Sequence, residues 1–141
     1  MEKVEGMQRF VLHEPIEKDA LFERVCSNLQ DEGVITSSVL VEAALRKRER
    51  LSSTLIDEQT AMPHCQETAV HEAKIVLVDC HQFPVKWTEE GIWVTGVVFL
   101  FLSEQTSQEQ LLAMRSFVRG LADHQVVQAL FQTKSVNNMT S

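Results

Sequence analysis

The chain is organised around one segment: Arg48-Glu49-Arg50-Leu51-Ser52-Ser53-Thr54-Leu55-Ile56-Asp57-Glu58-Gln59-Thr60-Ala61-Met62-Pro63-His64-Cys65. Its basic start follows an amphipathic stretch and is expected at the C-terminal end of a helix. Its second half predicts a short strand at residues 60–62, which Pro63 ends because proline has no N–H to donate. Proline also fixes the backbone just before His64, so the sequence predicts a rigidly placed imidazole.

Helical and strand patterns lie on both sides of this segment. Apolar spacing predicts helices over residues 15–32, 39–50, 107–121 and 125–131. Apolar and β-branched runs predict buried strands over 74–80 and 96–102, with a short strand pair at 85–87 and 92–94. This order predicts a single-domain α/β sandwich, a small mixed β-sheet flanked by helices. The domain is expected to span residues 1–141, with its core at about residues 9–133.

Charge and cysteine content exclude several classes of protein. The 141 residues include 13 Lys and Arg against 20 Asp and Glu, a net charge of −7, which disfavours binding to nucleic acids and to anionic membranes. The longest apolar run, residues 92–102, is about half of what a membrane-spanning helix needs. The N-terminus is charged where a secretion signal would be apolar, and the three cysteines form no CxxC pair. The sequence therefore predicts a soluble cytoplasmic protein with reduced thiols and no membrane insertion.

The candidate chemistry rests on histidine. The chain has five histidines, His13, His64, His71, His81 and His124, and their spacings match no common metal-binding pattern. Five glycines are spread along the chain without a glycine-rich phosphate loop, so neither a metal nor a nucleotide cofactor is expected. A single histidine is more often structural than functional, and geometry alone does not single out His64.

A wider pattern does single it out. Eight residues of the segment lie in register, without a gap, with a known active-site signature: Arg48, Glu49, Thr54, Ala61, Met62, Pro63, His64 and Cys65. The chain resembles the enzyme IIA domains of the fructose–mannitol family of the bacterial phosphoenolpyruvate-dependent sugar phosphotransferase system. Chain length and element order are similar as well, so the resemblance covers nearly the whole sequence.

The resemblance implies a phosphotransferase component. His64 would accept a phosphoryl group from phospho-HPr and pass it to an enzyme IIB component of a IIB/IIC permease for sugar uptake. A neutral imidazole is a good nucleophile at cellular pH. Arg48 would stabilise the phosphoryl oxygens, because a guanidinium offers a planar set of donors. Without the motif, Arg48 would count as one of four basic residues at a helix end. Thr54 would hydrogen-bond the loop or the imidazole, and Cys65 would be the small residue that the motif requires.

The chain departs from the family pattern in two places. Asp57 and Glu58 replace a glycine-containing turn, and Gln110 occupies the place of the second histidine, at the start of the late amphipathic helix. The amide of Gln110 can donate a hydrogen bond to a phosphoryl group, but it cannot titrate or carry positive charge. The alternative function is therefore a regulatory module, nitrogen-related or degenerate, whose phosphorylation state controls protein binding. The sequence identifies neither the sugar nor the oligomeric state.

Overall fold

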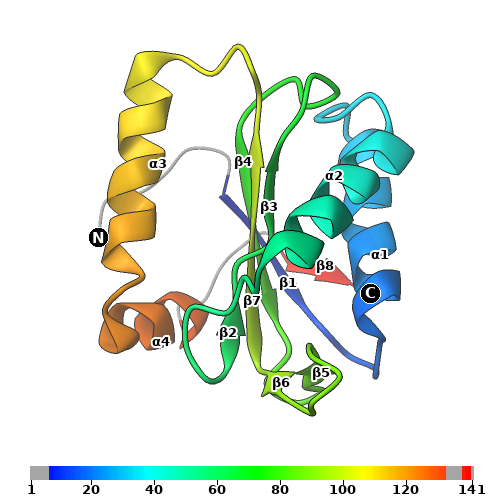
Figure 1. The fold of residues 1–141 in the computed structure, drawn as a ribbon, viewed down its shortest axis with the longest axis vertical. Coiled ribbons are helices and arrows are strands. Elements are labelled where there is room, and N and C mark those ends of the chain that lie inside the picture. The colour runs from blue at the N-terminus through cyan, green and yellow to red at the C-terminus, as the bar shows by residue number, and fades with distance from the viewer. Residues whose placement is uncertain (1–6, 133–137, 141) are drawn as a thin grey trace.

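A computed structural model describes residues 7–132 and 138–140 (Figure 1). Four helices and eight strands follow one another along this part of the chain. In order they are β1 (Met7–Val11), α1 (Lys18–Asp31), α2 (Ser38–Leu51), β2 (Thr60–Ala61), β3 (His64–Gln66), β4 (Lys74–Asp79), β5 (Val85–Lys86), β6 (Trp93–Val94), β7 (Gly96–Leu102), α3 (Gln108–Gly120), α4 (His124–Gln132) and β8 (Asn138–Thr140).

The main sheet is mixed. Its strand order is β2-β7-β4-β1-β8, and β3 also pairs with β7. β4 and β7 are antiparallel, whereas β1 runs parallel to β4 and β8, and β2 and β3 run parallel to β7. β5 and β6 form a separate two-stranded sheet.

Helices cover both faces of this sheet (Figure 1). α1 and α2 pack on one face, where Val76 and Val78 of β4 belong to a cluster with residues of both helices. α3 and α4 pack on the other face, where Ile75 and Leu77 of the same strand join Met114 and Phe117 of α3. Because alternate residues of a strand point to opposite faces, a strand covered on both sides must be apolar throughout. The predicted sandwich, a small mixed sheet flanked by helices, is confirmed.

The short strand predicted at residues 60–62 is β2 (Thr60–Ala61), and it ends before Pro63 as predicted. The sequence analysis missed β3, which begins directly after Pro63 along the same edge of β7, so that the register continues from Ala61 opposite Val97 to His64 opposite Leu100. The carbonyl of Pro63 accepts a hydrogen bond from the Leu100 N–H at 3.0 Å. An edge strand tolerates proline because the N–H it lacks would face away from the sheet. The interruption places His64 at the first residue of β3.

The sequence analysis also missed β1, which forms an inner strand beside β4. No helix among the described residues has the length and apolar character required to cross a membrane.

Candidate functional site

His64 lies where β3 meets the C-terminal end of α2, and its side chain is half-buried. Its Nδ1 lies 2.9 Å from the carbonyl oxygen of Met62, two residues earlier. A carbonyl oxygen can only accept a hydrogen bond, so this contact assigns the ring proton of the neutral imidazole to Nδ1. The lone pair is then on Nε2, the ring nitrogen that is available as a nucleophile.

Arg48 donates a hydrogen bond to His64 Nε2. Its Nε lies 3.2 Å from His64 Nε2, and its Nη1 lies 3.0 Å from the carbonyl oxygen and 3.2 Å from the hydroxyl oxygen of Ser52. The guanidinium therefore joins the last turn of α2 to the imidazole. Because Arg48 is half-buried, its donors are already partly removed from water and fixed in direction.

The other basic residues of this helix end do not contact His64 among the described residues. Arg46 pairs with Glu42 at 3.3 Å and with Asp19 at 3.5 Å. Lys47 and Arg50 are exposed, and none of their hydrogen bonds or ion pairs reaches His64. Of the four cations that the sequence offered, the structure brings Arg48 to the imidazole.

Thr54 lies behind the site and is buried, with 5% exposure. Its hydroxyl donates to Glu49 Oε1, and its carbonyl accepts from the Met62 N–H at 2.8 Å. Thr54 thus acts on the loop rather than on the imidazole. Glu49, to which sequence reasoning assigned no role, is the partner of Thr54. Its place in the matched motif, next to Arg48, was the signal that pointed to it.

Gln110 forms no hydrogen bond with His64 among the described residues. It lies in the first turn of α3, on the opposite face of the sheet from α2, and is exposed. Its backbone N–H donates to the hydroxyl of Ser107 at 3.2 Å, and its side chain makes no hydrogen bond to another described residue. Met114, one turn further along α3, packs in the same cluster as Met62. His64 pairs with Leu100 of β7, whose side chain belongs to the same cluster, so the imidazole is on the α3 side of the sheet. The role of Gln110 beside a phosphoryl group stays a prediction.

The carboxylate of Asp57 stabilises the loop before β2. Its Oδ1 accepts from the Gln59 N–H at 2.8 Å, and its Oδ2 lies 3.3 Å from Nδ1 of His124, the first residue of α4. Glu58 is exposed. The acidic pair thus forms a turn tied to α4 in place of the expected glycine-containing turn.

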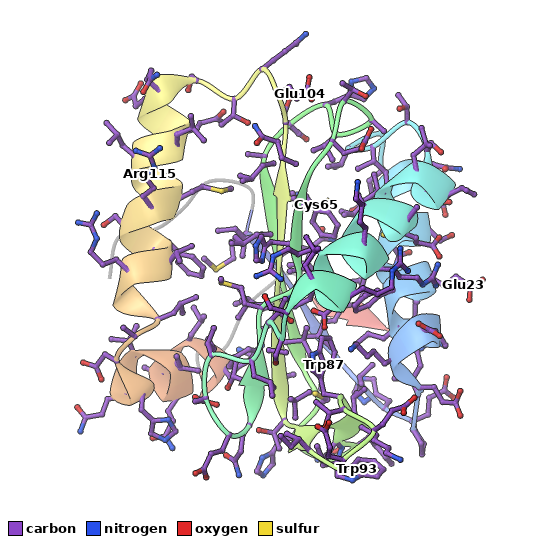
Figure 2. All side chains as sticks on the ribbon, viewed as in Figure 1. Glu23, Cys65, Trp87, Trp93, Glu104 and Arg115 are labelled. Atoms are coloured by element: carbon purple, nitrogen blue, oxygen red, sulfur yellow. The ribbon has the colours of Figure 1, made fainter. Side chains whose placement is uncertain are left out.

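Cys65, next to the imidazole, packs against α2 within the core (Figure 2). Burial, together with the nearby charge of Glu67, raises the pKa of its thiol to about 12. The thiolate is the reactive form, so this cysteine is not a nucleophile at neutral pH. No group of three or more His, Cys, Asp or Glu side chains suited to a metal ion occurs within the described part of the chain.

Comparison with known proteins gives one family and several similar structures. The family model described as "Phosphoenolpyruvate-dependent sugar phosphotransferase system, EIIA 2" matches residues 8–141. No curated protein matches the chain significantly. The nitrogen regulatory protein IIA-Ntr from Neisseria meningitidis has a similar fold, with a TM-score of 0.67 and 24% identity over 89% of this chain and 86% of that one.

Two structures from Escherichia coli share the fold as well. IIA mannitol has a TM-score of 0.65 and 22% identity, over 92% of this chain and 90% of that chain. The enzyme IIA of mannitol in its complex with phosphorylated enzyme IIB has a TM-score of 0.66 and 20% identity, over 92% and 88%. At these identities the structural matches support the fold.

Proposed function

Because the chain belongs to the EIIA 2 family of the phosphoenolpyruvate-dependent sugar phosphotransferase system, we propose that it is a phosphoryl carrier with His64 as the acceptor. The carrier takes the phosphoryl group from phospho-HPr and passes it to an enzyme IIB component for sugar uptake. The cytoplasm, where HPr is found, is the proposed location.

One observation supports this proposal above the others: Arg48 Nε and the unprotonated His64 Nε2 lie 3.2 Å apart, while Nδ1 is held by the Met62 carbonyl. Phosphoryl transfer needs mainly a positioned nucleophile and donors for the equatorial oxygens. His64 supplies the positioned nucleophile, and Arg48, in contact with it, supplies the donors.

The transfer step follows from this geometry. The Nε2 lone pair attacks the phosphorus, the P–N bond to the phosphohistidine of HPr breaks, and the electron pair of that bond stays on the donor nitrogen. No proton has to move, because Nδ1 keeps its proton on the Met62 carbonyl throughout. The N–H groups of Arg48 then turn from Nε2 to the phosphoryl oxygens, where negative charge has accumulated.

Donation to enzyme IIB is the same step in reverse, with a nucleophile of the partner attacking the phosphorus. A complex of IIA mannitol with phosphorylated enzyme IIB is known for the structural neighbour from Escherichia coli, and it supports this kind of partner for the present chain. The net charge of −7 favours long-range attraction to basic partner surfaces, so transfer should slow as salt increases.

Phosphorylation by purified components tests the proposal. Incubation with phosphoenolpyruvate, enzyme I and HPr should add one acid-labile phosphoryl group, seen by intact-protein mass spectrometry. His64→Gln should abolish the addition, whereas His124→Gln, which changes an exposed histidine that contacts Asp57, should keep it. Unmodified wild-type protein beside a fully labelled control IIA would refute the carrier function.

Gln110 favours a second candidate, a regulatory module whose phosphorylation state controls the binding of other proteins. The family's second histidine is replaced there, and the fold is shared with the regulatory IIA-Ntr of Neisseria meningitidis. Both functions predict phosphorylation of His64. They differ in the next step, because a regulatory module keeps its phosphoryl group when enzyme IIB of the fructose–mannitol type is added, and a transport carrier loses it.

A further inference from the structure

Glu49 is an unusual feature of the region behind His64, because its carboxylate is almost fully buried. Only 11% of its side chain is exposed. Removing an ionised carboxylate from water is unfavourable unless both oxygens find partners. Here Oε1 accepts from the Thr54 hydroxyl, and Oε2 lies 3.1 Å from the ammonium of Lys18.

The cation that partners Glu49 comes from a distant part of the chain and is itself tightly held. Lys18 is the first residue of α1, 31 positions before Glu49. Its ammonium also donates to the Trp87 carbonyl at 3.1 Å and lies 4.4 Å from the centroid of the Trp87 ring. Trp87 is only 3% exposed, so Lys18 is anchored on the core.

Local rules do not favour lysine at that position. A positive charge at the N-terminus of a helix interacts unfavourably with the helix dipole, and acidic residues are preferred there. Such a departure from local preference is expected where a tertiary contact or a functional site requires the residue. At position 18 that tertiary contact is the ion pair with the carboxylate of Glu49.

A closed circuit of contacts connects this buried pair to the imidazole. Glu49 holds the Thr54 side chain, and the Thr54 carbonyl accepts from the Met62 N–H. The Met62 carbonyl accepts from His64 Nδ1, and His64 Nε2 accepts from Arg48, which precedes Glu49 in α2. Glu49 therefore connects the two segments that position His64. One is the C-terminal end of α2, which carries Arg48, and the other is the Thr54 loop, which pairs with Met62.

We propose that Glu49, neutralised by Lys18, is a positioning residue that keeps the ring proton of His64 on Nδ1 and Arg48 against Nε2; its effect on catalysis rests on the function proposed above. When the Thr54 loop loosens, the Met62 carbonyl leaves Nδ1, and the proton can transfer to Nε2. An imidazole with its proton on Nε2 has no lone pair there and cannot attack phosphorus through that nitrogen.

Two substitutions test the circuit from its two ends. Glu49→Gln keeps the size of the side chain and an oxygen for Thr54 but removes the charge that binds Lys18. Lys18→Gln removes the cation from outside the site, and Lys18→Arg keeps it. Arg24→Gln is the matched control: Arg24 lies on the same helix as Lys18, forms an ion pair at 3.2 Å with Glu14, which precedes the helix, and is not connected to Glu49 by the contacts described above.

The first measurement is the tautomer of His64 by ¹H–¹⁵N NMR, which needs no partner protein and tests positioning even where the carrier function fails. Wild type, Lys18→Arg and Arg24→Gln should show the proton on Nδ1. Glu49→Gln and Lys18→Gln should show a mixture with a larger Nε2–H fraction. A wild-type tautomer in both of these variants, with native far-UV circular dichroism, would overturn the proposal.

The second measurement is phosphoryl transfer from phospho-HPr. Loss of alignment should lower the maximal rate about tenfold or more in Glu49→Gln and Lys18→Gln, with the KM for phospho-HPr unchanged. Lys18→Arg should recover most of the rate, and Arg24→Gln should match wild type. An increased KM with an unchanged maximal rate would instead assign Glu49 and Lys18 to partner binding, against the proposal.

Discussion

Replacing Arg48 by alanine is the most direct test of the candidate site. The substitution removes the N–H group that lies 3.2 Å from His64 Nε2, together with the two contacts to Ser52. In the transition state of the proposed transfer, the same donors would stabilise the phosphoryl group. Loss of one charged donor from a preorganised site raises the barrier by about 2–3 kcal/mol.

The increase in the barrier predicts the decrease in the transfer rate. Each 1.36 kcal/mol is a factor of ten, so Arg48→Ala should slow transfer from phospho-HPr by about 30-fold to 150-fold. The effect on folding should be smaller, about 0.3–1 kcal/mol, because a cation in the last turn of α2 interacts favourably with the helix dipole.

Rapid quenching and separation of the phosphorylated form give the rate constant, and urea unfolding gives the stability. Lys47→Ala is the control, since Lys47 is exposed on the same helix end and changes the net charge equally. Its transfer rate should stay within about twofold of wild type, as expected for an exposed charge at the margin of a docking surface. Equal slowing by Arg48→Ala and Lys47→Ala would mean that the cation acts only through overall charge, and the assigned role would be wrong.

Three further outcomes are expected. Gly96→Ala should destabilise the fold by about 1–3 kcal/mol in urea unfolding, because a Cβ there would lie 2.7 Å from the Phe131 ring. Gly120→Ala should not, because a Cβ there would lie at an ordinary contact distance of 3.9 Å from Val126, and equal stabilities of the two variants would contradict this packing. Cys65 should resist Ellman's reagent in the native protein at pH 8, since its pKa is about 12, and rapid native labelling would contradict its burial. The contribution of Cys65 to stability should fall as pH rises from about 9 to 12, because in this range the thiol ionises in the unfolded protein before it ionises in the folded one. Gln110→His should speed transfer or change the phosphohistidine lifetime if Gln110 lies beside the phosphoryl group, and no change in either would contradict that position.

The regular elements were largely predictable because their signals are local. Residues 75–78 of β4 and 97–102 of β7 are apolar at every position, as a strand covered on both faces requires. The caps of α2 and α3 are serine hydroxyls that bond the backbone N–H three residues later, as the sequence of each helix start indicates.

β1 was not predictable in this way. Its sequence contains Gln8 and Arg9, which are buried at 8% exposure and would ordinarily indicate a surface segment. Arg9 is compensated by Asp79 at 3.1 Å, and Gln8 donates to Glu32 at 3.1 Å. Both partners lie far along the chain, so no window of neighbouring residues contains the reason for their burial.

The candidate site divides along the same line. Sequence alone supplied the candidate nucleophile, the proline that fixes it and, through the motif, Arg48 among the four cations, because residue chemistry and backbone restriction are properties of the residues themselves. Only the tertiary structure placed Arg48 Nε against His64 Nε2, assigned the lone pair to Nε2 and bound Thr54 to Glu49 instead of the imidazole. Hydrogen bonds form within about 3 Å and in fixed directions, so their partners are determined by how the helices and the sheet pack, which the order of residues does not state.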